Sequence, residues 1–323
     1  MASRLATFAL VGRGWRAAAY RRLGELLDGV TCVPAAAFGS LDECLTAVRP
    51  DFVVTAVPPT VNVGIVLAAV SRGVPVLSET PPGLDVRPLW PHADRIQVAE
   101  QYRLMPSHAA RLAAVRSGAI GTPFHVHVSS TQLHHAVSLM RGYLDVPIGP
   151  VTVRATRHVA PLVNPLRRGG WTDDPAPHPA TTTLAMLDLG RGRSGLYDFT
   201  SNQTRNQLRF RRLVVRGSRG ELAGDAGFVR RHAGHQPGEH GNDTTHIAFR
   251  GEVVYRNPYV GKRLNDDEIA VGSMLDRTVA WVRGEGPAPY PLAEAAHDHA
   301  VGQAIEEAAD SGRTVVSGDG RLR

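Results

Sequence analysis

Short apolar runs alternate with longer amphipathic segments along the first third of the chain. The short runs predict buried strands, and the longer segments repeat their apolar residues with the period of a helix. The expected strands cover residues 7–11, 30–38, 52–57, 74–78 and 96–99. The expected helices cover residues 16–27, 41–48, 61–72 and 108–117. This alternation predicts parallel βα units, and therefore a doubly wound Rossmann-type domain over residues 1–120.

The pattern becomes strand-rich near residue 121. Apolar and polar residues then alternate with period two, which is typical of a half-exposed antiparallel sheet. The expected strands cover residues 123–131, 151–159, 181–189, 195–200, 208–218, 246–251 and 252–257. Helices are expected over residues 135–144, 266–283 and 292–310, and a long polar loop over 230–245. We therefore expect an α+β second domain over residues 121–323, with closing helices that can pack back on the first domain.

Composition narrows the classes of partner and compartment. The formal net charge of +6 comes almost entirely from scattered arginines, and Lys262 is the only lysine in the 323 residues. Because these charges do not interleave with aromatic residues, we expect no nucleic-acid partner. No apolar run approaches the about 18 residues of a membrane span, so we expect no membrane partner. Cys32 and Cys44 are too few for a disulfide framework, which favours a reducing, cytoplasmic location.

A glycine-rich motif follows the first expected strand. Gly12 and Gly14 precede the first helix, and Ala17 occupies the third position of a GxGxxG/A pattern. In dinucleotide-binding proteins such glycines permit a tight turn and a close approach of the pyrophosphate to the helix N-terminus. The residues of this turn, Arg13, Trp15 and Arg16, therefore belong with the two glycines to the expected cofactor site. The alternative is a glycine-rich turn without a ligand.

The end of the second expected strand bears on the choice between NAD and NADP. An NAD site usually carries a carboxylate about 20 residues after the motif, but this strand ends in CVPAAAFGS. Ser40, Arg13 or Arg16 could instead bind a 2′-phosphate, which gives a slight preference for NADP. The competing interpretation makes Ser40 and Glu43 a capping box and the arginines solvated surface charges.

Several motifs resemble the Gfo/Idh/MocA family of oxidoreductases. They are DFVVTAVPPT, GVPVLSETPPG, QVAEQYRLMPSHAARL, GAIGTPFHVHVSS, LVVRGSRGEL and the closing LAEAAHDHAVGQAIEEAADSGRTV, in the order of the family and over almost the whole chain. The resemblance implies a Rossmann domain, an open antiparallel sheet that forms oligomer contacts, and a nicotinamide cofactor. It also implies that Pro58, Glu79 and Pro81 shape the cofactor pocket.

The sequence departs from the family at two positions that matter for chemistry. The lysine of the family's Glu-Lys-Pro motif falls on Thr80, whose hydroxyl cannot act alone as an efficient acid or base. The family's Asp and His, one helical turn apart, fall on Thr131 and His135. An imidazole with a pKa of about 6.5 suits proton exchange, so His135 is the expected general acid or base. Tyr102 and His134 are the next candidates for this role. The alternative is that His134 and His135 only form local hydrogen bonds at a helix start.

Three polar residues follow the fifth expected strand, where ligands of open α/β sheets bind. They are Gln101, Tyr102 and Arg103. Gln101, Arg103 and His134 are the expected substrate contacts, because a guanidinium fork binds carboxyl or hydroxyl groups well. Arg103 could equally pair with a surface carboxylate.

The fourteen histidines raise the question of a metal site. His125 and His127 share one face of an expected strand, and a second group falls in the polar loop at His232, His235, His240 and His246. Neither group has the cysteine or carboxylate spacing of a known site, so we expect no metal.

These features predict an NAD(P)-dependent oxidoreductase that transfers a hydride to or from a small polar molecule. The resemblance makes a sugar, a cyclitol or a related hydroxy compound the expected substrate class. One alternative is an imine reductase of natural-product metabolism, and another is a non-catalytic dinucleotide sensor or regulatory protein. An antiparallel sheet with one uncovered face favours a homo-oligomer.

Overall fold

The computed structural model describes residues 5–167, 169–233 and 243–318, and divides into two compact units. The first unit comprises Met1–Ala109, Arg230–Ile247 and Tyr255–Ala296. The second comprises Ala110–Val229, Ala248–Val254 and His297–Arg323. This division is discontinuous in sequence, in contrast to the continuous domains 1–120 and 121–323, which stay a prediction.

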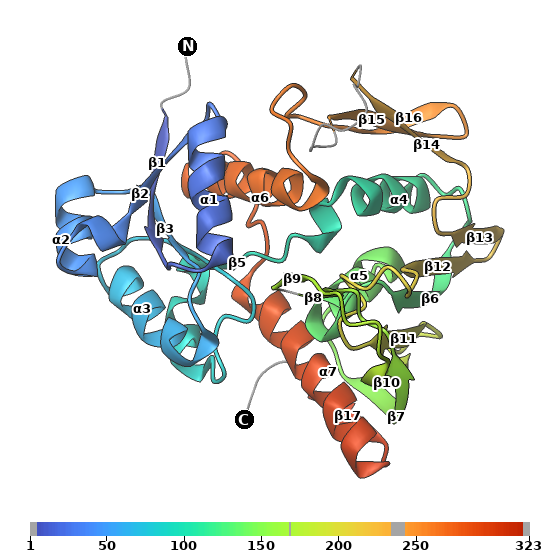
Figure 1. Cartoon of the computed structure of the whole chain (residues 1–323). Helices are drawn as coiled ribbons and strands as arrows, with labels where there is room; N and C mark the ends of the chain where they lie inside the picture. Colours follow the sequence, from blue (N-terminus) through green and yellow to red (C-terminus); the bar gives the residue numbers. More distant parts are fainter. Residues whose placement is uncertain (1–4, 168, 234–242, 319–323) are drawn as a thin grey trace. The chain divides into compact units, whose positions relative to one another are not determined.

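The first unit is built on a five-stranded parallel sheet (Figure 1). Its strands are β1 (Ala6–Val11), β2 (Val30–Pro34), β3 (Phe52–Thr55), β4 (Val76–Ser78) and β5 (Ile96–Val98). The spatial order is β2-β1-β3-β4-β5, and each neighbouring pair is parallel. The chain turns to one side of β1 for β2 and to the other for β3, so a topological switch point lies at the carboxyl end of β1. The predicted Rossmann topology is confirmed.

The helices of the first unit begin and end close to the predicted positions. They are α1 (Trp15–Leu26), α2 (Leu41–Val48) and α3 (Pro59–Ser71), followed by α4 (Pro106–Arg116) at the boundary of the unit. Three short 3₁₀ helices, η1 (Ala35–Ala37), η2 (Arg87–Arg95) and η3 (Tyr102–Leu104), were not predicted. The strand expected over 30–38 therefore ends at Pro34, where the proline cannot donate to a sheet.

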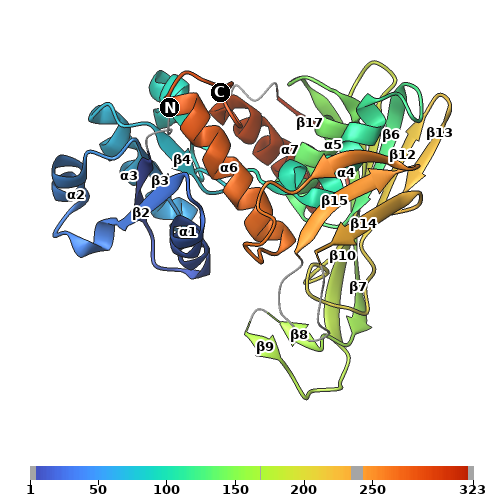
Figure 2. The same ribbon diagram turned by 90° about the horizontal axis from the view of Figure 1, so that it is seen from above.

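A helix from far along the sequence completes the core of the first unit. Figure 2 shows α6 (Asp266–Val282) beside α1. Ile269 and Leu275 of α6 lie in the same buried cluster as Leu23 of α1 and Phe8 of β1. On the other side of the sheet, Leu292 at the start of α7 (Leu292–Ser311) packs in the cluster formed with α2 and α3.

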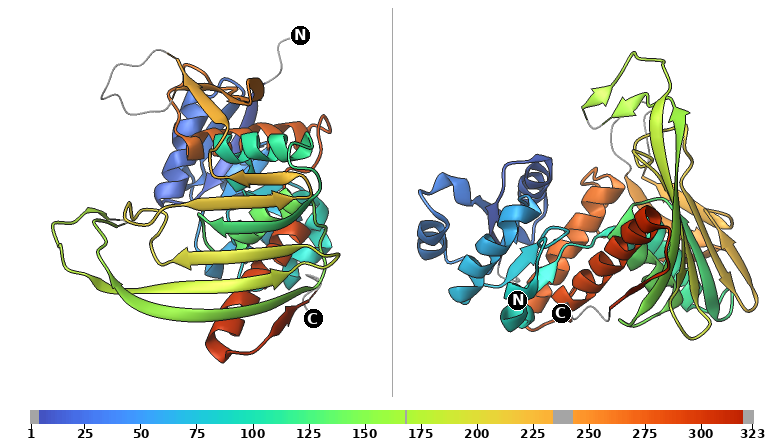
Figure 3. Two further views of the ribbon diagram at one scale, coloured as in Figure 1. Left: turned by 90° about the vertical axis from the view of Figure 1, so that its right-hand side faces the viewer. Right: turned by 90° about the horizontal axis from the view of Figure 1, so that it is seen from below.

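The second unit contains a seven-stranded sheet. Its strands are β6 (Pro123–Ser129), β7 (Val151–Leu162), β10 (His178–Asp188), β11 (Ser194–Thr200), β12 (Arg212–Gly217), β13 (Gly220–Ala223) and β17 (Val315–Ser317). The order is β13-β12-β6-β11-β10-β7-β17, antiparallel except between β6 and β11. Helix α5 (Leu133–Leu144) and the second-unit part of α7 lie on one face of this sheet (Figure 3). The predicted open antiparallel sheet is confirmed.

Several smaller elements differ from the prediction. Residues 208–211 are not a strand, because Asn206 accepts a 2.9 Å hydrogen bond from the backbone of Leu208 and makes a turn there. The expected loop 230–245 is partly strand, since β14 (Phe228–His232) and β15 (Thr244–Phe249) occupy its ends and pair in a sheet with β16 (Glu252–Arg256). The hairpin of β8 (Leu166–Arg167) and β9 (Gly170–Trp171) was also not predicted. In the described part of the chain, no helix is long and apolar enough to cross a membrane.

Candidate functional site

Gly12 and Gly14 of the motif have different surroundings in the turn between β1 and α1. Gly12 has φ +147°, and a Cβ there would lie 2.3 Å from the carbonyl oxygen of Ala56 and 3.3 Å from Cβ of Ala17. Gly12 therefore also lets the end of β1 approach the residue that follows β3, in addition to the tight turn expected of it. A Cβ on Gly14 would meet no described atom within 4 Å, so the space beside this residue is open.

Helix α1 begins with the features of an anion-binding site. Gly14 is its N-cap residue, and among the described residues no side chain caps it. The first turn contains no acidic residue. Because the first N–H groups of a helix have no partner inside the helix and carry the positive end of its dipole, this terminus favours a phosphate.

Arg16, which was expected to meet a 2′-phosphate, is instead engaged by two carboxylates. Its Nη1 donates a 2.6 Å hydrogen bond to Oδ2 of Asp267 on α6, and its Nε lies 3.6 Å from Oε1 of Glu79. The side chain is only 14% exposed, so it is not a solvated surface charge either. Burial opposes the charge, but Glu79 and Asp267 outweigh it and raise the pKa of Arg16. The guanidinium also lies 4.4 Å from the ring centre of Trp15.

Glu79 is fixed from a second side by Tyr20. The hydroxyl of this fully buried tyrosine donates a 2.7 Å hydrogen bond to Oε1 of Glu79. Burial and the neighbouring carboxylate raise the pKa of Tyr20, so the hydroxyl keeps its proton. Sequence reasoning missed Tyr20; its place one helical turn after Arg16 was the available signal.

Gln101 joins the same network and carries an unsatisfied atom. Its Nε2 donates a 3.2 Å hydrogen bond to Oδ1 of Asp267. The residue is 3% exposed, and its Oε1 has no hydrogen-bond partner among the described residues. A buried amide oxygen of this kind costs free energy unless a ligand or water donates to it. Asp267 was the second residue that sequence reasoning missed.

The Glu-Thr-Pro turn that follows β4 is held from inside by Asn62 of α3. The side-chain amide of Asn62 donates 2.7 Å hydrogen bonds to Oγ of Ser78 and to the carbonyl of Pro82. These contacts bracket Glu79, Thr80 and Pro81, and the peptide bond between Thr80 and Pro81 is cis. In the connection that follows the neighbouring strand β3, Pro58 is the N-cap residue of α3.

Ser40 acts as a helix cap. Its Oγ accepts a 3.1 Å hydrogen bond from the backbone of Glu43, and the carboxylate of Glu43 accepts one of 2.9 Å from the backbone of Gly39. The capping interpretation is therefore confirmed for Ser40, although Glu43 reaches Gly39 rather than closing the box. Of the two arginines expected at a 2′-phosphate, Arg13 is exposed and Arg16 is not.

Of the three polar residues expected after β5, Tyr102 and Arg103 lie on η3 and Gln101 is its N-cap residue. The backbone N–H of Tyr102 donates a 3.2 Å hydrogen bond to Glu100, and the guanidinium of Arg103 lies 5.3 Å from the ring centre of Tyr290. Lys262 pairs with Asp28 at 2.9 Å, which agrees with leaving it out of the mechanism.

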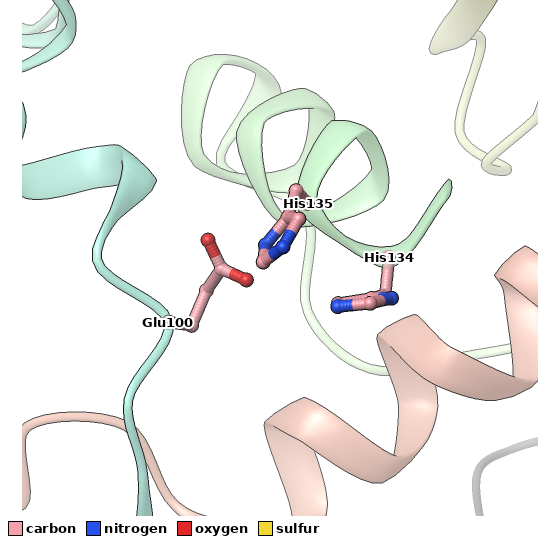
Figure 4. A group of neighbouring side chains, drawn as sticks. All are labelled: Glu100, His134 and His135. Atoms are coloured by element: carbon pink, nitrogen blue, oxygen red, sulfur yellow. The ribbon is translucent and has the colours of Figure 1, made fainter. Parts of the chain in front are cut away.

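In the second unit, His134 and His135 project from the first turn of α5 with their rings side by side (Figure 4). The ring centres are 4.1 Å apart, and His299 of α7 meets His134 at 6.0 Å. Burial, with smaller contributions from His135 and His299, holds the pKa of His134 well below its usual value. Thr131 is fully buried, and its hydroxyl has no hydrogen-bond partner among the described residues.

Three of the other histidines contact polar side chains. Nδ1 of His125 lies 2.9 Å from the hydroxyl of Ser194, and Nε2 of His127 lies 3.6 Å from a carboxylate oxygen of Asp198. His246 contacts the hydroxyl of Thr245 at 3.1 Å. Of the four histidines noted in the polar loop, His235 and His240 lie outside the described residues.

Comparisons with known proteins place the fold. No protein-family model and no curated protein sequence match the chain. A myo-inositol dehydrogenase from Corynebacterium glutamicum is 20% identical, with a TM-score of 0.65 over 97% of this chain and 98% of that one. An oxidoreductase from Agrobacterium radiobacter, solved with NAD+, L-tartaric acid and magnesium, is 15% identical, with a TM-score of 0.69 over 96% and 98%. GenD2 from gentamicin A biosynthesis, solved with NAD, is 18% identical, with a TM-score of 0.66 over 97% of each chain. The fold implied by the Gfo/Idh/MocA resemblance is therefore confirmed.

Proposed function

We propose that this protein is an NAD(P)-dependent oxidoreductase acting on a small polar substrate, with a sugar, a cyclitol or a related hydroxy compound as the expected class. The observation that carries the proposal is the uncapped N-terminus of α1 beside Gly14, at the switch point of a parallel sheet. The inositol dehydrogenases and NAD-bound oxidoreductases among the structural neighbours support it.

The residues present fit a dinucleotide. Gly14 leaves space for a close approach, the first turn of α1 offers N–H groups, and no acid there repels a phosphate. The buried amide oxygen of Gln101, which has no hydrogen-bond partner among the described residues, suits its expected role as a substrate contact. Pro58, Glu79 and Pro81 would line the nicotinamide end, with Glu79 held rigid by Tyr20 and Arg16.

The choice between NAD and NADP depends on the end of β2. This strand ends at Pro34 with no carboxylate to hold a ribose or to repel a 2′-phosphate. Because Arg16 is engaged with Asp267 and Ser40 caps α2, Arg13 is the residue we propose for a 2′-phosphate. This keeps the slight preference for NADP.

The bound nicotinamide would supply hydride transfer at its C4 atom. We assign the proton to His135: when the substrate hydroxyl is oxidised, its proton passes to a ring nitrogen of His135, and the reverse step returns it. Thr80 donates a hydrogen bond to the substrate oxygen and orients it without carrying charge. Tyr102 and His134 are the alternative residues for proton exchange. Arg103 is the residue we propose to bind an acidic or hydroxylated substrate.

Turnover tests this assignment. The purified protein is incubated with NAD+ or NADP+ and, in turn, myo-inositol, scyllo-inositol and L-tartrate, while reduced nicotinamide is followed by absorbance. With an accepted substrate, His135→Gln should lower kcat by about 10²- to 10⁴-fold and leave cofactor binding unchanged. His178→Gln is the matched control, because His178 is 47% exposed on β10. Unchanged turnover in His135→Gln would remove this residue from the mechanism.

A second candidate rests on Thr80. A C=N compound gains a hydride at carbon and a proton at nitrogen, and an imine nitrogen is basic enough to need only a weak proton donor. If the protein oxidises no polyol but reduces cyclic imines with NADPH, this function replaces the first. Tight cofactor binding without any turnover would instead support a sensor.

We further propose a homo-oligomer in a reducing, cytoplasmic setting. Large apolar side chains are exposed on strands of the second unit, with Met186 68%, Val159 64% and Val316 61% exposed. Such residues favour a covered surface. Both Cys32 and Cys44 are free thiols. Light scattering on the wild type and on Met186→Lys tests the assembly.

A further inference from the structure

The backbone directly before the two histidines of α5 adopts a conformation that side-chain-bearing residues rarely take. Leu133, the first residue of α5, has φ +41°. The preceding Gln132 is extended, with φ −97° and ψ 147°. A non-glycine residue with positive φ persists only where its surroundings enforce it, and such residues concentrate at functional sites.

A buried tyrosine of the sheet holds this residue. The backbone N–H of Leu133 donates a 3.2 Å hydrogen bond to the hydroxyl oxygen of Tyr197. Tyr197 lies on β11, is 2% exposed, and stacks on Phe199 with ring centres 6.3 Å apart. Its backbone is fixed on both sides, opposite Val128 of β6 and Ala185 of β10. The hydroxyl of Tyr197 is therefore held in a fixed position at the start of α5.

Helix α7 also packs closely against the start of α5. A Cβ on Gly302 would lie 3.2 Å from the backbone nitrogen of His134 and 3.3 Å from Cβ of Leu133. Contacts this short leave little room for any residue larger than glycine. Three elements of the second unit thus meet at Leu133 of α5: β11 contacts the peptide before this residue, and α7 the peptide after it.

We propose that Tyr197 is a positioning residue: its hydroxyl keeps Leu133 at positive φ and so sets the direction in which His134 and His135 leave the helix. The catalytic meaning rests on the proposed function, in which His135 exchanges the proton. The positioning itself does not, because it concerns the conformation of the free protein. An ordinary helical φ at Leu133 would change the direction of the first turn of α5. The rings of His134 and His135 would move with it.

The test uses four variants of the full chain and one control variant. Tyr197→Phe removes the hydroxyl and keeps the ring. Tyr197→Phe with Leu133→Gly adds a residue that adopts positive φ without cost. Leu133→Gly and Leu133→Ala are compared in the wild-type background. Tyr143→Phe is the control, because Tyr143 is equally buried on α5 and lies away from its first turn.

The first measurement is the ring resonances of ¹³C,¹⁵N-labelled histidine, assigned with His134→Gln and His135→Gln. Tyr197→Phe should shift the signals of His134 and His135, and the double variant should return them toward the wild type; Tyr143→Phe should leave them in place. If an accepted substrate is known, kcat should fall on the order of tenfold in Tyr197→Phe with KM little changed, and recover in the double variant.

The second measurement is unfolding in urea. Leu133→Gly should be more stable than Leu133→Ala, the reverse of the order at ordinary helical positions. This comparison stands even if Tyr197→Phe does not fold. Wild-type resonances in Tyr197→Phe, no recovery in the double variant, or greater stability of Leu133→Ala would each overturn the proposal. Absence of nicotinamide binding would sink the proposed function and leave these measurements unaffected.

Discussion

The hydroxyl of Tyr20 on α1 donates a 2.7 Å hydrogen bond to the carboxylate of Glu79, the residue before Thr80. Arg16, one turn earlier on the same helix, approaches the same carboxylate at 3.6 Å and binds Asp267. The helix proposed to hold the pyrophosphate is therefore tied to the turn proposed to line the nicotinamide. Changes in this network should alter both stability and cofactor binding.

Tyr20→Phe tests that connection. The variant leaves Glu79 without its hydroxyl donor and should lower the free energy of unfolding by about 1.5–3 kcal/mol, as for a hydrogen bond to a charged group. It should also weaken NAD(P)H binding. Tyr259→Phe is a suitable control, since that hydroxyl donates to Asp276 at 2.6 Å elsewhere in the first unit. Equal loss of binding in both variants would point to general destabilisation.

Alanine substitutions at the two motif glycines should differ in their effect on the free energy of unfolding. Gly12→Ala places a Cβ 2.3 Å from the Ala56 carbonyl at φ +147°, and should destabilise the fold by at least about 2 kcal/mol. Gly14→Ala meets open space and should cost less than about 1 kcal/mol. Urea unfolding at one pH compares the two. Equal losses would contradict the different roles assigned to these glycines.

Arg13 and Arg16 should differ in their effect on cofactor choice. Arg16→Met leaves the carboxylates of Glu79 and Asp267 without their cation, so it should destabilise the protein by about 3 kcal/mol and weaken NADH and NADPH binding alike. Arg13→Ala should weaken NADPH selectively, because only NADPH carries the 2′-phosphate. The dissociation constants of NADH and NADPH are measured for each variant. An equal weakening of both by Arg13→Ala would remove Arg13 from the phosphate site.

Acid should destabilise the second unit through His134. Its pKa is lowered in the folded state, so above pH of about 6.5 neither state is protonated and the full stability is present. As pH falls below that value, the unfolded chain binds a proton that the folded chain excludes, and stability is lost. His134→Gln should reduce this loss by up to about 1.4 kcal/mol per pH unit. Urea unfolding between about pH 7.5 and about pH 5.5, one unit on either side of the reference pKa of about 6.5, measures the slopes, with His178→Gln as the control. Identical slopes for the wild type and His134→Gln would contradict the assignment.

The first-unit fold followed closely from the sequence because its signals are local. Apolar periodicity located α2 at its observed bounds, and the glycine motif located the β1–α1 turn. The surroundings of Arg16 could not be found in this way, since its partner Asp267 lies 251 positions further on. The same holds for Leu133 and Tyr197, whose contact depends on how β11 lies under α5. Long-range pairs of this kind leave no periodic trace.

The most direct test of the central claim is titration of the purified protein with NADH and, separately, NADPH, followed by nicotinamide fluorescence, with Gly14→Asp beside the wild type. Aspartate is a favourable N-cap residue, so the variant should stay folded while its charge repels the pyrophosphate. We predict saturable binding to the wild type, tighter for NADPH, and none to folded Gly14→Asp. No binding of either cofactor to the wild type, or equal binding to the variant, would contradict a dinucleotide site at α1.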